Sequence, residues 1–143
     1  MTATLRREEG ETITTIIHIT SEHEWEQALH LGWYAPESLA REGFIHCSNP
    51  QQVIRVANAL FRGLHGLVLL HVEVEKLSSA VVYENLEGGV ELFPHVYGPI
   101  ELEAVRTVTR FEPAADGRFD HHSTDLGNEP AWTVPAPDAA SIR

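Results

Sequence analysis

The chain has 143 residues, which is enough for one domain with a substantial hydrophobic core. Its 21 Asp and Glu residues against 10 Lys and Arg give a net charge of −11, which repels polyanions and argues against binding of nucleic acid or of an anionic membrane surface. The single cysteine excludes an intramolecular disulfide, and the sequence shows neither a secretory leader pattern nor an apolar run of membrane-spanning length. We therefore expect a cytoplasmic protein with a small-molecule partner, and the oligomeric state stays open.

The first predicted elements are a strand and a helix. Residues 12–19 are rich in Thr and Ile, the β-branched composition of a strand, and they carry His18 near the strand's end. Ser21 and Glu24 then form a capping-box signature. Together with the apolar stripe that follows, this signature predicts a helix that ends near Gly32.

A turn at residues 33–36 and a short helix at 37–42 are predicted to lead into a second strand at 44–47. Asn49 as N-cap and Pro50 in the first helical position predict another helix, which stops at Gly63.

Strands dominate the remaining part of the predicted domain. They are expected at residues 67–74, 80–83, 90–96 and 101–111, and Pro94 is expected to put its segment at a sheet edge or a bend. Helices early and strands late indicate an α+β domain.

Composition divides the chain into three parts. Residues 1–12 form an N-terminal extension, 13–112 the domain, and 113–143 a Pro-rich tail that lacks periodicity. Such a composition predicts an extended or partly disordered tail that lies over the domain, with Trp132 as an anchor.

Three histidines stand in apolar or strand-forming surroundings, at His18, His46 and His95. A buried imidazole without a partner is costly, so each should be hydrogen-bonded, catalytic or metal-bound. Taken alone, His18 and His46 are each more readily explained as hydrogen-bonded structural residues, and His95 is about as readily explained that way. Their spacing does not match the helical histidine pairs of zinc enzymes, so no metal is predicted. Cys47 should point away from His46 and be a small buried residue, and Glu84 is the main acidic candidate near a strand end.

Several motifs resemble those of the bacterial family of unknown function numbered 952, over about residues 15–111. The motifs that carry the resemblance are His18-Ile19-Thr20, Glu24-Trp25, Gly43-Phe44-Ile45-His46-Cys47-Ser48, Val56-Ala57-Asn58, Tyr83-Glu84 and Leu92-Phe93-Pro94-His95-Val96-Tyr97-Gly98-Pro99. The resemblance implies an ADP-ribosyltransferase-like fold: a compact α+β unit with a split β-sheet, a ligand cleft and two to three helices.

The resemblance also implies site residues. By order and strand context, His18 corresponds to the residue that touches the NAD ribose and His46 to the residue beside nicotinamide, while His95 or Tyr97 occupies the region of the usual late-strand Glu. A neutral imidazole lacks the negative charge that favours a developing cation. The residues expected to bind substrate are Thr20, Tyr34, Ser48, Phe93 and Tyr97, with Tyr34 and Tyr97 as stacking faces.

Two main hypotheses follow. The first is an enzyme that uses NAD or another ADP-ribose-type nucleotide in glycosyl transfer, with His18, His46 and His95 as catalytic residues. The second is a non-catalytic nucleotide-binding or sensor module, which the missing late Glu favours. A phosphotransferase acting on a small molecule is a further alternative, because RNA 2′-phosphotransferases of the same superfamily also lack that Glu. The histidines could also only hold the sheet together.

Overall fold

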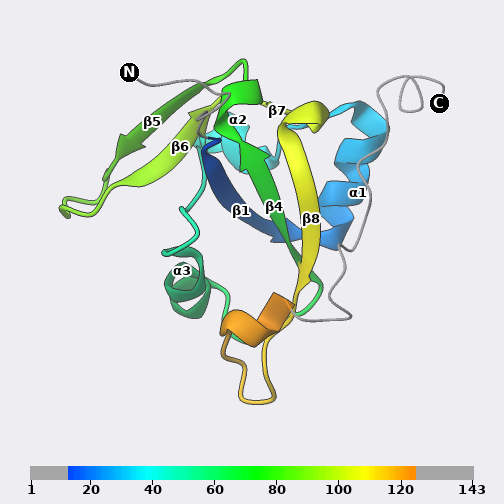
Figure 1. Cartoon of the computed structure of the whole chain (residues 1–143), viewed down its shortest axis with the longest axis vertical. Coiled ribbons are helices and arrows are strands. Elements are labelled where there is room, and N and C mark those ends of the chain that lie inside the picture. Colours follow the sequence, from blue (N-terminus) through cyan, green and yellow to red (C-terminus); the bar gives the residue numbers. More distant parts are fainter. Residues whose placement is uncertain (1–12, 125–143) are drawn as a thin grey trace.

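The computed structural model describes residues 13–124, and its centre is a three-stranded antiparallel sheet in the order β1-β4-β8 (Figure 1). The sheet consists of β1 (Thr15–Ser21), β4 (Leu67–Glu73) and β8 (Val105–Phe111). The central strand β4 is buried on both faces for most of its length, as its run of Leu and Val residues predicts. This sheet is the platform on which the other elements rest.

A second antiparallel sheet has the order β3-β6-β5. It contains β3 (Ile45–His46), β6 (Phe93–Tyr97) and β5 (Ala80–Glu84), and a separate two-stranded pair joins β2 (Trp33–Tyr34) to β7 (Ile100–Glu101). An isolated bridge between Ile17 and Ser48 connects β1 to the end of β3, with backbone hydrogen bonds of 2.7 and 2.8 Å. The two larger sheets therefore meet at β1 and β3.

Three α-helices accompany the sheets: α1 (Glu22–Leu31), α2 (Glu37–Glu42) and α3 (Val53–Leu60). The Ser21 hydroxyl accepts a hydrogen bond from the Glu24 amide at 3.0 Å, and Gly32 ends α1 with a φ of 95° that a glycine adopts at little cost. Both caps of α1 were predicted, and so were the bounds of α2. The α+β class is thus confirmed.

The start of α3 lies further along the chain than predicted. The Asn49 side chain does accept hydrogen bonds, from the amides of Gln51 and Gln52 at 2.9 Å each, but it caps a turn and the α-helix begins only at Val53. The predicted turn at residues 33–36 is also different, because Trp33 and Tyr34 pair with β7.

The long strand predicted at residues 101–111 is broken into three elements. These are β7, the 3₁₀ turn η3 (Leu102–Ala104) and β8. Alternation of side chains does not reveal the break, because Leu102, Ala104 and Val105 are all buried around it. A further 3₁₀ turn, η2 (Val74–Lys76), follows β4, and the strand predicted at 90–96 is the shorter β6.

Pro94 lies in the central strand of its sheet, so the predicted edge position is wrong. Its carbonyl accepts from the Cys47 amide at 3.0 Å on the β3 side, and β3 pairs with β6 only at Ile45 and His46. Because the nitrogen and carbonyl of a strand residue point to the same side, the proline nitrogen faces the place where the β3 ladder ends. No ladder hydrogen bond is lost there.

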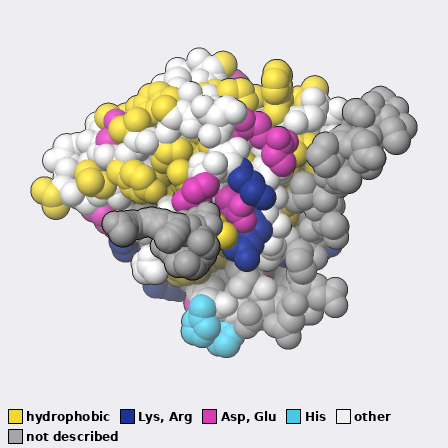
Figure 2. Space-filling model, turned by 45° about the horizontal axis from the view of Figure 1, so that its top comes forward, with side chains coloured by type: hydrophobic (Ala, Val, Ile, Leu, Met, Phe, Trp, Pro, Cys, Tyr) yellow, Lys and Arg dark blue, Asp and Glu magenta, His cyan; other side chains and the backbone are white. Residues whose placement is uncertain are grey.

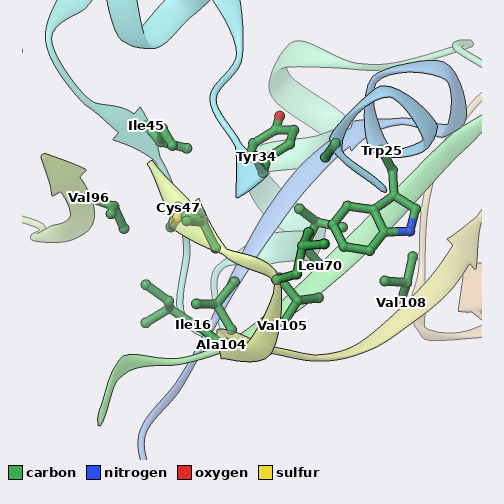
Figure 3. Close-up of a cluster of buried hydrophobic side chains, with 14 of the residues drawn as sticks. Ile16, Trp25, Tyr34, Ile45, Cys47, Leu70, Val96, Ala104, Val105 and Val108 are labelled. Carbon is green, nitrogen blue, oxygen red and sulfur yellow. The ribbon is translucent and has the colours of Figure 1, made fainter. Parts of the chain in front are cut away.

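The main hydrophobic core lies between the first sheet, α1 and the inner face of the second sheet (Figure 3). Trp25 from α1 packs with Leu70 and Val108 of the first sheet, while Ile45 and Val96 contribute from the second sheet. The Trp25 Nε1 atom is the one fully enclosed side-chain nitrogen or oxygen without a hydrogen-bond partner within residues 13–124. A smaller core cluster covers the other face of β1, below α3.

The first part of the Pro-rich segment packs onto the domain. Phe119 is buried and stacks on Phe111 with a ring-centroid distance of 4.5 Å, and the Asn58 side chain bonds both the amide and the carbonyl of Phe119. The 3₁₀ turn η4 (His121–Thr124) follows. The predicted N-terminal extension at 1–12 and the remaining tail, with Trp132, lie outside the described residues.

Candidate functional site

A cleft of about 750 Å³ opens between β1, α3 and the β5–β6 hairpin, and the three histidines singled out in the sequence all line it. Figure 1 shows α3 and the hairpin on the same side of β1. The His46 and His95 rings are 4.9 Å apart, and the His18 ring bonds the carbonyl of His46. Residues from three different elements therefore converge on one site.

The register of the second sheet explains why polar groups gather on one of its faces. His46 lies opposite His95, and His95 lies opposite Val82. Since directly paired residues in antiparallel strands share a face, Glu84 and Tyr97, each two residues along, project to the same side. The other face carries Ile45 and Val96, which enter the core.

His95 is held by a carboxylate. Its Nδ1 lies 2.8 Å from Glu84 Oε2, and the Tyr97 hydroxyl donates to the same oxygen. The hydrogen bonds from Tyr97 and His95 hold the pKa of Glu84 below its ordinary value, while the bond to Glu84 raises the pKa of Tyr97. Glu84 is therefore ionised at neutral pH and fixes the His95 Nδ1–H tautomer.

The second nitrogen of His95 is free to meet a ligand. Its side chain is only 4% exposed, yet within residues 13–124 Nε2 has no hydrogen-bond partner and is not among the fully enclosed polar atoms. Because His95 lines the cleft, Nε2 opens onto it. The Phe44 ring stacks on His95 at 4.4 Å and holds the imidazole plane in place.

His46 is the most accessible of the three histidines. Its side chain is 55% exposed, and its Nε2 lies 3.1 Å from Glu42 Oε1 at the end of α2. Phe44 also contacts its ring edge at 4.7 Å. The imidazole can rotate toward a ligand at the cost of one exposed hydrogen bond, which is small.

His18 belongs to a buried chain of hydrogen-bonding groups. Its Nδ1 donates to the His46 carbonyl at 2.6 Å, and its Nε2 lies 2.7 Å from the Tyr34 hydroxyl. The Tyr34 hydroxyl lies 2.9 Å from Thr20 Oγ1, which donates to Glu24 Oε1 at 2.6 Å. Both ring nitrogens of His18 are thus engaged within the protein.

This environment changes the roles expected for His18 and Tyr34. Burial lowers the pKa of His18 to about 4, although the bond to the His46 carbonyl and the nearby Glu24 act to raise it. With both nitrogens occupied, His18 can hold a ribose hydroxyl only by giving up an internal bond. Tyr34 is 2% exposed, so it offers no stacking face, and that expectation is wrong.

The other expected binding residues differ in access. Thr20 and Ser48 are buried in the wall of the cleft, and Phe93 lines it half-buried. Tyr97 is 40% exposed, and its ring can still offer a face beside Glu84. Cys47 is buried, which raises the pKa of its thiol, so it is a core residue as predicted.

The cleft has one polar and one apolar region. The polar region holds His46, His95 and Glu84, with Arg41 also lining the cleft. The apolar region is formed by Val56, Ala59 and Leu60 at α3 and by Leu86 at the hairpin tip. Figure 2 shows apolar side chains gathered on the side of the molecule where the hairpin lies. The exposed apolar residues of the hairpin are Val82, Tyr83, Leu86, Val90, Leu92 and Tyr97.

An ion pair joins the hairpin to α3. Arg55 bonds both carboxylate oxygens of Glu91, at 2.8 and 2.9 Å, and the buried Gln52 donates to the same carboxylate. Arg55 therefore serves to fix the far wall of the cleft.

Comparison with known proteins gives the family. Residues 19–108 match the family described as "Protein of unknown function (DUF952)". The chain belongs to this family. The resemblance noted in the sequence motifs is thereby confirmed at the family level.

Solved structures of one relative resemble this DUF952 chain. The crystal structure of protein CC0527 from Caulobacter crescentus is 35% identical with a TM-score of 0.68, and the match covers 75% of this chain and 94% of CC0527. The solution NMR structure of CC0527 gives 34% identity, a TM-score of 0.66, and coverage of 76% and 93%. No curated protein matches the chain.

An acidic side chain stands beside His95 in the DUF952 site. From the sequence, Glu84 is the main acidic candidate near a strand end, and His95 occupies the region of the usual carboxylate. The structure places Glu84 directly beside His95 in the cleft. The signal was present, because Glu84 ends a strand whose neighbour carries His95. Glu42, four residues before His46, could have been found from that spacing, although Gly43 interrupts the helix between them.

Two features are absent from the described residues. Between residues 13 and 124, no group of three or more His, Cys, Asp or Glu side chains is arranged to hold a metal ion. None of the helices in this range is long and apolar enough to cross a membrane.

Proposed function

We propose that this DUF952 domain is an enzyme of the ADP-ribosyltransferase-like class that acts on NAD or another ADP-ribose-type nucleotide. The observation that carries the proposal is the pair formed by Glu84 and His95, which lines a cleft of about 750 Å³ together with His46. A cavity of this volume falls within the range of small-molecule and cofactor sites. The polar and apolar regions suit a ligand that combines charged groups with flat rings.

In the proposed reaction, the bond between the ribose carbon and nicotinamide breaks and its electron pair leaves with the nicotinamide. The cationic ribose carbon then forms a bond to the oxygen of water or of an acceptor hydroxyl. His95 Nε2 takes the proton of that oxygen, because Glu84 keeps the hydrogen on Nδ1 and stabilises the resulting imidazolium. The negative charge of Glu84 also favours the cationic carbon.

His46 and Arg41 complete the proposed site. Both line the cleft, where the His46 imidazole can hydrogen-bond the departing nicotinamide amide and the Arg41 guanidinium can pair with a phosphate. Arg41 has only a loose ion pair with Glu37, at 3.6 Å between two exposed side chains, so it can turn to a ligand. His18 is a positioning residue, because its ring holds the His46 carbonyl by a hydrogen bond.

Single-turnover assays with Glu84→Gln test the chemistry. We expect nicotinamide release from NAD to fall by roughly 10²–10⁴-fold, the usual contribution of general acid–base catalysis, while nucleotide binding persists. Glu103→Gln is the matched control, because Glu103 is an exposed glutamate of η3 outside the cleft. Equal rates for the two variants would contradict the assignment of Glu84.

A second candidate is a nucleotide sensor without turnover. The hydrogen bond from Tyr97 favours this candidate, because Tyr97 and His95 both bond the same Glu84 oxygen and so reduce the charge that Glu84 can offer to a cationic carbon. The single-turnover assay separates the candidates, because a sensor returns the bound nucleotide unchanged.

A further inference from the structure

The buried chain around His18 contains too few hydrogens for its contacts. Four contacts link the His46 carbonyl, His18, Tyr34, Thr20 and Glu24, at 2.6, 2.7, 2.9 and 2.6 Å in that order. Each contact of this length needs one hydrogen between its two atoms. This series of hydrogen-bonded groups therefore requires four hydrogens.

Neutral His18 and ionised Glu24 supply only three. The ring gives Nδ1–H to the carbonyl, Tyr34 and Thr20 have one hydroxyl hydrogen each, and a carboxylate has none. Tyr34 donates to Thr20 and Thr20 donates to Glu24. The contact between Nε2 of neutral His18 and the Tyr34 hydroxyl oxygen, at 2.7 Å, is therefore left without a hydrogen.

One added proton completes the chain, and it can do so in two ways. On Glu24, it lets the carboxyl donate to Thr20, Thr20 to Tyr34, and Tyr34 to His18 Nε2. Alternatively, the hydrogen of Tyr34 moves to His18 Nε2, that of Thr20 to Tyr34, and that of Glu24 to Thr20. The second arrangement leaves Glu24 ionised and His18 as an imidazolium, with no atom gained or lost.

The two ends of the hydrogen-bonded series, Glu24 and His18, differ in access to solvent. Glu24 is an exposed residue of α1, whereas His18 is 9% exposed and Thr20 and Tyr34 are buried. A proton from solvent can therefore enter at Glu24, and the hydroxyl groups lead inward to the imidazole. The His18 ring faces the cleft floor beside the His46 carbonyl.

We propose that Glu24, Thr20, Tyr34 and His18 form a proton relay, in which a proton taken up by the exposed carboxylate is passed through the two hydroxyl groups to the imidazole under the cleft. Its arrival places a positive charge below the site where an anionic ligand is expected to bind. The relay is a property of the free protein, and it does not depend on the proposed reaction.

Other titratable groups near His18 have different connections. His46 of β3 and Cys47, the residue after β3, line the same cleft, and so do Arg41 and Glu37 of α2. Its paired residue on β4 is the apolar Leu70. From α3, Arg55 is engaged by Glu91. Of the neighbouring titratable groups, Glu24 is connected to the ring through hydroxyl groups, and His46 acts on it through charge.

Thr20→Val tests the relay without changing the charge of Glu24. Valine keeps the shape of threonine but removes the hydroxyl that joins Tyr34 to Glu24. We expect the midpoint of His18 protonation, followed through its ring nitrogen signals by NMR, to fall by about one pH unit or more, a tenfold loss of proton affinity. Thr20→Ser retains the hydroxyl and should keep the wild-type midpoint.

His71 is the internal control in each sample. It is a partly buried histidine with a threonine partner, Thr109 at 3.0 Å, and it should titrate alike in all variants. An unchanged His18 midpoint in folded Thr20→Val would overturn the relay. If Thr20→Val does not fold, NMR of the wild-type protein provides the test. The relay requires the Glu24 carboxyl signal and the His18 ring signals to change together in one pH-dependent step. Independent steps would overturn it.

Discussion

His18 and His95 are both almost inaccessible, with 9% and 3% of their surfaces exposed, yet their hydrogen bonding differs. His18 uses both ring nitrogens inside the protein, whereas His95 uses Nδ1 for Glu84 and leaves Nε2 toward the cleft. The depth of burial therefore does not separate these two histidines. The number of ring nitrogens that the fold occupies does separate them.

The largest effect that tests this comparison is on stability. His18→Ala should lower the free energy of unfolding by about 4 kcal/mol, because it removes a buried ring and leaves the His46 carbonyl and the Tyr34 hydroxyl without a partner. Urea unfolding at pH 7 measures this change. His46→Ala is the contrast, and it should cost less than about 1 kcal/mol because its side chain is half exposed. Equal losses in both variants would remove the distinction between the two regions.

A smaller effect concerns pH. The pKa of His18 is lowered from 6.5 to about 4 by folding. Between these two pH values the imidazole is protonated in the unfolded chain and neutral in the folded protein. The contribution of His18 to the free energy of unfolding is therefore complete above pH 6.5 and is lost as the pH falls toward 4. The total loss is about 3 kcal/mol, because each unit of pKa shift corresponds to about 1.36 kcal/mol.

Urea unfolding between pH 7 and pH 4 checks this dependence against His18→Gln. The variant should lose about 3 kcal/mol less than the wild type over that range, since glutamine does not titrate. His71 and the other titrating groups are present in both proteins, so their contributions cancel. A wild type and a variant with parallel pH profiles would show that His18 is not buried in its neutral form.

Local features of the fold could be predicted from the sequence. The bounds of α1 and α2 follow from Ser21, Gly32 and Gly43, whose capping roles depend only on near neighbours in the chain. The break between β7 and β8 could not be predicted in the same way. Buried residues occur on both sides of that segment, and the contacts that decide its path come from elements distant in sequence.

The candidate site was predicted in part. The three histidines were found because each stands out in an apolar segment, and each lines the cleft. The roles of Tyr34 and Glu84 depend on which strands pair. The pairing of β2 with β7 contributes to the burial of Tyr34, and that of β5 with β6 brings Glu84 to His95. A single sequence does not reveal such pairings between distant strands.

We propose that the cleft binds an ADP-ribose-type nucleotide through His46 and His95. Titration of the full chain with NAD and with ADP-ribose, followed by NMR of the histidine ring signals, tests it most directly. We expect saturable shifts of the His46 and His95 ring signals, with the His71 signal unchanged because His71 lies outside the cleft. Ring signals of His46 and His95 that stay unchanged at millimolar nucleotide would contradict it.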